Sequence, residues 1–565
     1  MIAIGSTAQA GLDSRDVNDN SIAIGSRSRA YSLTGVDQLG SNAAGGSSTA
    51  IGTFAKAYGL DSPVAIGDQA MATGRSALAV GGKPGMAGTK AQGDFSVAIG
   101  GGAIAGPSAT YGVAMGFDSS AQQFNSVAVG ANALSSANSA VAVGTRAKAT
   151  NINASAFGDG SSASGANAVA VGSNSSASGA YSIAAGFGAT ASKANTIAAG
   201  TFARATYANG VAVGENAYSH GDRSIAIGKN SNADWYDSIA IGTSAYSARS
   251  NSIAIGDLAL AQNASATAMG ANAQALKDYA TAICPNSTAR GNSDVVMGYN
   301  AQTMGGDNSI VMGTNAYSTG GGSLVMGLDA KGFQGGNVVS LGTNANTIGS
   351  STVAIGSNSI AGGLGQWTKD LGGTLGTTLT DFHHGYDVAI GNKTKAQSTD
   401  GYDQAGKLVS GSGSATAIGT FSEAIGLGSP TAIGDQARAY GRNSIAIGGN
   451  PNGAGTKAEG DFSVALGAGA ITSLNAINSI AIGNGALAKA NNAFAFGVST
   501  SADNTNAIAF GSYTKAQANN AVAFGISNTL TAENASVLGN NNVINTAYTS
   551  IVGSNNKIDT GATGT

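Results

Sequence analysis

The chain is poor in charge, cysteine and long apolar runs, and each shortage excludes a class of protein. Charged residues are 10% of its 565 residues and the net charge is −3, so no basic field can hold nucleic acid or an anionic membrane. The single cysteine, Cys284, allows no internal disulfide and no cysteine-based zinc site. No apolar run approaches the roughly 20 residues of a membrane-spanning helix. The opening MIAIGSTAQAG lacks the basic segment and apolar core of a signal peptide.

Glycine is abundant and regularly spaced. From Gly116 to Gly298 a glycine falls every fourteenth residue, with Cys284 taking one glycine position, and the same spacing returns from Gly483 to Gly553. A fixed period of this kind is typical of repeat architectures. The chain is therefore predicted to be a β-solenoid with one coil per fourteen residues.

Two short alternating patterns fill each repeat. Valine or isoleucine flanks an alanine just before the glycine, as in Val127 to Val129, and alternation at period two with β-branched residues indicates a strand. After the glycine, small residues flank a variable one, as in Ala147 to Ala149. This predicts a second strand with small side chains inside and the variable side chain in water. The glycine is expected in a tight turn at positive φ.

The residues of the first strand predict an oligomer, on the expectation that its large side chains face inward. We expect valine and isoleucine to pack against the small residues of the second strand, which leaves the alanine facing outward. A solvated face does not require alanine, whereas close contact with another backbone does. The pattern thus predicts copies of the chain packed around a central axis.

The segments NSVAVGANA, NSIAIGDLALA and NSIAIGNGALAKA, beginning at Asn125, Asn251 and Asn478, resemble the head repeat of YadA-like trimeric autotransporter adhesins. The resemblance implies an all-β, left-handed parallel β-roll assembled as a parallel homotrimer. It implies a non-enzymatic head on the surface of Gram-negative bacteria, anchored to the outer membrane through segments absent from this chain. The partners expected from it are the chain itself and a matrix protein or host-cell receptor, with no nucleic acid, no cofactor and no direct membrane insertion.

A duplication and an interruption predict the domain organisation. AGTKAQGDFSVAIG at 87–100 returns as AGTKAEGDFSVALG at 454–467. We expect a first head unit at 1–356, an insertion or junction at 357–390 and a second unit at 391–565 that partly duplicates 49–116. The asparagine runs at 535–559 are expected to stack as ladders along the roll.

The candidate ligand contacts lie in that interruption and on the second strands. Trp367, His383, His384 and Tyr386 are of types common in binding hot spots; the alternative is that the interruption only joins the two units. Adjacent histidines point apart on an extended chain, so no metal site is predicted. Tyr218 and Tyr246 are expected to be exposed on second strands.

The function predicted is multivalent attachment by a surface adhesin, in which repeated weak contacts gain avidity. The alternative is a phage or secreted fibre segment that attaches to a receptor. Asp and Glu are scattered without a recurring pair, so a glycan-cleaving solenoid enzyme is not expected. Cys284 is expected to be a packed, unreactive thiol.

Overall fold

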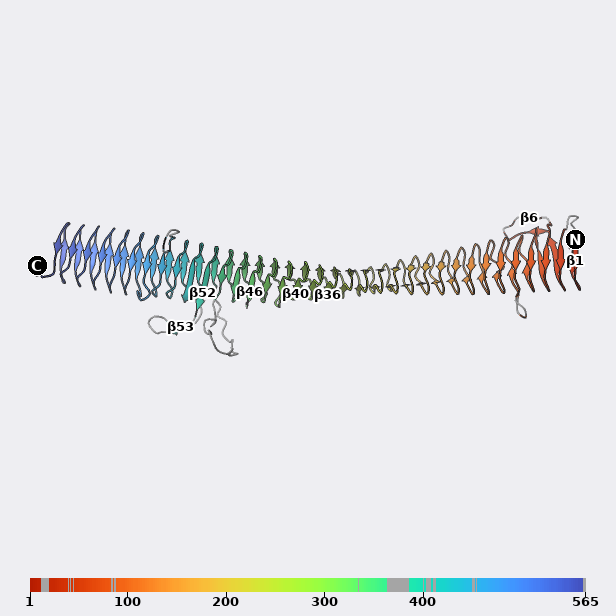
Figure 1. Ribbon diagram of the computed structural model, residues 1–565, viewed down its shortest axis with the longest axis horizontal. Helices are drawn as coiled ribbons and strands as arrows, with labels where there is room; N and C mark the ends of the chain where they lie inside the picture. Colours follow the sequence, from red (N-terminus) through yellow and green to blue (C-terminus); the bar gives the residue numbers. More distant parts are fainter. Residues whose placement is uncertain are drawn as a thin grey trace. The chain divides into compact units, whose positions relative to one another are not determined.

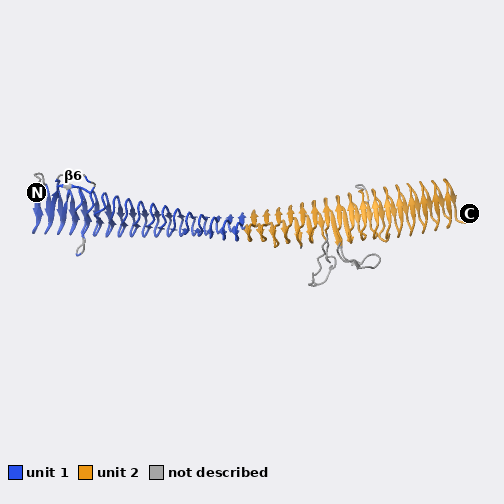
Figure 2. Ribbon diagram, turned by 180° about the vertical axis from the view of Figure 1, so that it is seen from behind, with its two compact units in different colours: residues 1–272 blue, residues 273–565 orange. Residues whose placement is uncertain are grey.

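The computed structural model describes residues 1–565 except 12–19, 39, 41, 44, 83–84, 86–87, 334, 363–385, 400, 403–407, 410–412, 450–452, 454 and 562–565. The described residues form strands and turns with no helix, and therefore none that could span a membrane. Contacts within the chain divide it into two compact units, Met1–Asn272 and Ala273–Thr565 (Figure 2). The domain boundaries at 357–390 that the sequence predicts stay a prediction.

A typical coil contains one strand of three residues and one of two. Strand β17 (Val127–Val129) pairs in parallel with β19 (Val141–Val143), and β18 (Leu134–Ser135) pairs in parallel with β20 (Lys148–Ala149). The three-residue strands of successive coils form one parallel sheet, here called sheet A, and the two-residue strands form sheet B (Figure 1). The parallel β-solenoid predicted from the glycine spacing is confirmed.

The turns explain the rest of the repeated motif. Gly130, directly after β17, has φ +128°, and a Cβ there would lie 2.5 Å from the carbonyl oxygen of Gly144 in the next coil. Asn125, before β17, has φ 54°, a left-handed conformation that asparagine tolerates better than most residues. The Ser126 hydroxyl donates to the carbonyl oxygen of Gln123 at 2.6 Å. The positive φ expected at the glycine is therefore confirmed.

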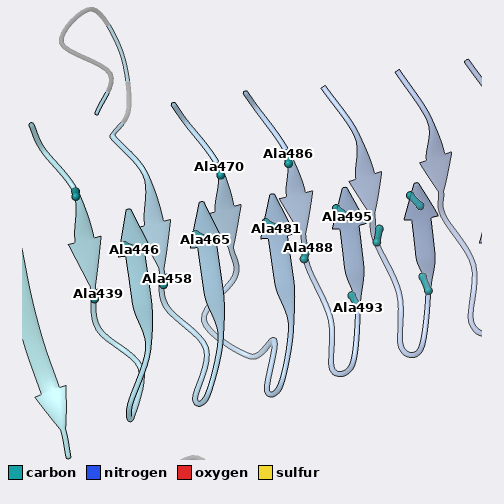
Figure 3. Close-up of a cluster of buried hydrophobic side chains, with 14 of the residues drawn as sticks. Ala439, Ala446, Ala458, Ala465, Ala470, Ala481, Ala486, Ala488, Ala493 and Ala495 are labelled. Atoms are coloured by element: carbon teal, nitrogen blue, oxygen red, sulfur yellow. The ribbon is translucent and has the colours of Figure 1, made fainter. Parts of the chain in front are cut away.

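Alanine, rather than valine and isoleucine, fills most of the interior of the solenoid; in unit 2 some interior positions hold larger residues, such as Val311, Leu530 and Ile544. Ala128 and Ala142, the central residues of β17 and β19, are fully buried, while the flanking valines are only partly buried. Ala147 and Ala149 are also buried, and Lys148 between them is exposed. Figure 3 shows the alanines of both sheets along the coils of unit 2. The orientation predicted for the second strand is confirmed.

The orientation predicted for the first strand is wrong, and so is the oligomer argument built on its alanines. Alternation at period two separates two faces of a strand without stating which face is inside. The large residues were assigned to the inside because burial usually favours them. In this chain the two sheets lie close enough that methyl and hydroxyl groups fill the space between them, so the large side chains face outward.

Sheet A consequently carries large apolar side chains on its outer face. In unit 1, Val171, Ile183 and Ile197 have 43%, 41% and 38% of their surface exposed. In unit 2, the ring of Phe510 lies 4.7 Å from that of Phe496 and 5.7 Å from that of Phe524. The outer face of sheet A is thus an apolar row in each unit.

The fourteen-residue coil is extended in the same way once in each unit. Strand β4 (Arg29–Leu33) pairs with β8 (Lys56–Leu60), and the hairpin β5 (Gly35–Val36) and β6 (Asn42–Ala43) lies between them in sequence. In unit 2, β52 (Lys395–Thr399) pairs with β56 (Glu423–Leu427), with the hairpin β53 (Gly401–Tyr402) and β54 (Leu408–Val409) between them. Both hairpins leave sheet B continuous.

The asparagine ladder expected near the end of the sequence is confirmed. The Nδ2 of Asn542 donates to Oδ1 of Asn528 at 3.0 Å, and the Nδ2 of Asn556 donates to Oδ1 of Asn542 at 2.9 Å. Asn528 and Asn542 are fully buried. Their amides also donate to the carbonyl oxygens of Gly539 and Gly553 at 2.6 and 2.8 Å, so the buried amides stay hydrogen-bonded.

Candidate functional site

Aromatic and acidic side chains gather where three consecutive sheet B strands of unit 1 end. The strands are β28 (Arg204–Ala205), β30 (Tyr218–Ser219) and β32 (Asn232–Ala233). The backbone N–H of His220 donates to the carbonyl oxygen of Ala233 at 2.8 Å, and the N–H of Thr206 donates to that of Ser219 at 3.0 Å. Since successive coils are in register, the turns that follow these strands stack on one another.

These turns enclose a groove of about 500 Å³, here called the aromatic groove. Tyr207, Gly221 and Trp235 occupy the same place in three successive coils. Gly221 adds no side chain to this surface, and glycine is required there because a Cβ would lie 2.1 Å from the backbone carbonyl of Trp235. The residues that line it are Tyr207, Tyr218, His220, Gly221, Asp222, Asp234, Trp235 and Tyr236.

Contacts among the side chains order the walls of the groove. The hydroxyl of Tyr218 and the Nδ1 of His220 share a hydrogen bond. The ring of Tyr207 meets the imidazole of His220 edge-on at 5.0 Å, and the rings of Trp235 and Tyr236 are edge-on at 5.5 Å. Trp235 and Tyr236 nevertheless expose 41% and 50% of their surface, so ring surface remains open to a ligand.

Neither of the two carboxylates of the groove forms a salt bridge among the described residues, although Arg223 attracts Asp222 electrostatically. Asp222 accepts from the backbone N–H of Ala208 at 3.1 Å, and Asp234 accepts from the hydroxyl of Tyr246 at 2.7 Å. That hydrogen bond, helped by partial burial, raises the pKa of Tyr246. The groove therefore presents negative charge beside aromatic rings.

Two arginines lie close to the groove. Arg223 forms a bidentate pair with Asp237 at 2.6 and 2.7 Å, and its hydrogen bond lowers the pKa of the Asp237 carboxyl against the small opposing effect of burial. Arg249 lies over the ring of Trp235, 5.6 Å from the ring centroid. Neither arginine is among the residues that line the groove.

The structure brings together only part of the predicted set of contacts. Tyr218 lines the groove, and Tyr246, on β34 (Tyr246–Ser247), reaches its edge through Asp234. Tyr386 lies in unit 2 with 63% of its surface exposed. Trp367, His383 and His384 lie outside the described residues. Whether any of these residues contacts a ligand stays a prediction.

The other lining residues were missed by the sequence reasoning. The sequence pointed to the interruption of the glycine spacing and to the variable position of the second strand. The groove is instead built from the turn that lies two to four residues after that variable position. The available signal was the alignment of YAN, GDR and WYD at the same place in three successive repeats. Reading each repeat position down the stack, rather than along the chain, would have found them.

Other candidates for chemistry are weak in the described residues. No group of three or more His, Cys, Asp or Glu side chains could hold a metal ion among them. The thiol of Cys284 is free and partly buried, on a residue with φ 93°.

The comparison with protein families identifies the repeat. The model of the YadA head domain repeat matches more than half of the chain, at residues 43–62, 64–83, 87–105, 108–133, 121–147, 149–175, 177–203, 208–231, 236–259, 261–283, 305–330, 431–450, 452–470, 475–500 and 502–527. No curated protein matches the chain. The YadA head and its β-solenoid are typical of non-enzymatic adhesins of the cell surface. The chain belongs to the YadA head family.

Proposed function

We propose that this chain is the head of a bacterial surface adhesin that works as a parallel homotrimer of left-handed rolls. The observation that carries the proposal is the outward apolar face of sheet A in a chain of YadA head repeats. Monomeric soluble proteins rarely expose contiguous apolar surface beyond a few hundred Å². Three sheet A faces packed around one axis would remove these rows from water, at roughly 25 cal/mol per Å² of apolar surface buried.

Sheet B and its turns would remain at the surface of such a trimer and provide the binding surface. Each chain offers the same sites, so a trimer presents every weak contact three times, and avidity increases with the number of contacts that engage together. The expected partners are an extracellular matrix protein, a host-cell receptor or other cells. Segments outside this sequence would anchor the head to the outer membrane.

Attachment of coated beads tests the function. Beads carrying the purified chain are allowed to settle on surfaces coated with collagen, fibronectin or laminin and on cultured host cells, with albumin-coated beads as the control. We expect more attachment than the control on at least one surface, and more for the trimeric fraction than for any single-chain fraction. Attachment equal to the albumin control on every surface, by a chain shown to be trimeric, would refute the proposal.

A further inference from the structure

The aromatic groove has the features of a site for an organic cation. It combines partly exposed rings of Tyr207, Trp235 and Tyr236 with the carboxylates of Asp222 and Asp234. No lysine or arginine lines it, although Arg249 lies over the ring of Trp235. Ring faces attract cations through their quadrupole, and the two carboxylates add attraction of the same sign.

The stacking of coils separates Tyr207 from Trp235 by a distance that suits a cation between them. Tyr207 and Trp235 belong to coils on either side of Gly221, and parallel strands lie about 4.8 Å apart. A cation seated at the level of Gly221 would thus be about 4.8 Å from the level of each ring. This axial spacing allows each ring to approach a cation within the range of about 6 Å, provided that a ring face turns toward it.

The hydrogen bonds of the groove favour a quaternary over a primary ammonium. One oxygen of Asp222 already accepts from the N–H of Ala208, and one oxygen of Asp234 already accepts from the hydroxyl of Tyr246. A primary ammonium brings three N–H donors, each of which needs an acceptor when it is taken out of water, and the second oxygens of the two carboxylates would supply two of them. A trimethylammonium group brings no donor, and its methyl groups suit the ring surfaces.

A comparison within the chain shows that the glycine alone does not make this site. Gly165 and Gly179 occupy the position of Gly221 in earlier coils. The residues that follow them are Ala166 and Ala180, where Asp222 follows Gly221. Of these three places, only residues 207–236 combine the glycine with both aromatic side chains and carboxylates.

We propose that the aromatic groove binds a trimethylammonium group of the choline type, held between Tyr207 and Trp235 and neutralised by Asp222 and Asp234. Choline headgroups at a host surface and free choline share this chemistry. The inference deepens the proposed function by naming a ligand class, and it rests on that function only for its biological setting. Choline binding by the purified chain and bead attachment are separate measurements, so either can fail while the other holds.

The test is a titration of the full chain with choline in which calorimetry measures the heat of binding. The uncharged isostere 3,3-dimethylbutan-1-ol measures what shape alone contributes. We expect choline to bind at least about 10-fold more tightly than the isostere. Trp235→Ala should weaken choline binding about 10-fold, between the losses of an exposed and of a desolvated cation–π contact. The double variant Asp222→Asn with Asp234→Asn should weaken it about 10-fold as well, because both negative charges are lost. Tyr181→Ala, which removes an exposed ring from another turn of unit 1, should leave binding unchanged.

Four results would overturn the proposal: no heat of binding with choline, equal binding of the isostere, tighter binding of lysine than of choline, or displacement of choline by a neutral monosaccharide. Circular dichroism of each variant separates lost binding from lost folding. Vesicles of phosphatidylcholine, with phosphatidylglycerol vesicles as the control, distinguish the two sources of the group. Binding to the vesicles supports a lipid headgroup, and binding only of soluble choline supports the free cation.

Discussion

Glycine recurs at every fourteenth residue because two constraints act on that position. At Gly130 the backbone has φ +128°, and the space that a Cβ would need is occupied by the carbonyl of Gly144. That carbonyl cannot easily move, because its oxygen accepts from the backbone N–H of Ala147 at 3.2 Å. The same arrangement repeats from coil to coil, so glycine at this position allows successive coils to approach as closely as they do.

Gly130→Ala is expected to destabilise the chain by more than about 1 kcal/mol, since alanine is incompatible with this conformation. Chemical unfolding followed by circular dichroism measures the change. Lys148→Ala, at an exposed position of β20, serves as the matched control and should shift stability little. An unchanged unfolding midpoint for Gly130→Ala would contradict the role given to the glycine ladder.

Cys284 offers the reverse experiment, because it occupies a ladder position with φ 93° and carries a side chain there. Cys284→Gly is expected to raise stability by about 1 kcal/mol, the scale of the strain that a left-handed conformation costs a residue with a Cβ. The thermal unfolding midpoint should rise. A lower midpoint would mean that packing of the thiol outweighs the backbone strain.

At the scale of the strand, the interior of most coils holds small side chains, with Leu530 and Ile544 as the largest exceptions. Val325 is the inward residue of β45 (Leu324–Met326) in sheet A, and the residue opposite it in sheet B is Gly332 on β46 (Lys331–Phe333). A Cβ on Gly332 would lie 3.0 Å from a methyl carbon of Val325. At this coil, volume added on one sheet is thus matched by volume removed on the other, as expected of a close-packed interior.

Ala142→Leu is therefore expected to destabilise the chain by about 1–3 kcal/mol or more through overpacking. Lys148→Leu adds a leucine to the neighbouring strand at an outward position and should have little effect. Urea unfolding of both variants makes the comparison. Equal stability of the two variants would show that the interior has room to spare.

The sequence was sufficient for the strands, the period, the parallel stacking and the turns, because these follow from local backbone chemistry. It was insufficient for the inside and outside of sheet A, because Val127 and Ala128 alternate identically in either orientation. That choice depends on the distance between two sheets, which is a property of the whole coil. The aromatic groove was missed for a related reason: Tyr207, Gly221 and Trp235 are neighbours only after the coils stack.

At the scale of the whole molecule, a single chain hides alanine and exposes larger apolar residues. This inversion is favourable only if the outer face of sheet A is covered, and the proposed trimer covers it with two further copies. An outward row of alanines and an outward row of valines and isoleucines would thus both favour a trimer, for different physical reasons. They differ in which side chains meet at the axis.

Cross-linking distinguishes these side chains. In a chain with Cys284→Gly, a cysteine introduced as Phe510→Cys on sheet A should be joined between chains by a short bismaleimide. A cysteine introduced as Lys515→Cys on β68 (Lys515–Ala516) of sheet B should not. Denaturing electrophoresis reads the result. Efficient joining at Lys515→Cys and none at Phe510→Cys would place the interface on the wrong sheet.

The mass of the unmodified chain in solution, measured by light scattering after gel filtration, tests the central claim most directly. The account predicts a particle of three times 54.6 kDa that persists on dilution. A stable particle of one chain mass would contradict it, because the apolar rows of sheet A would then remain in water.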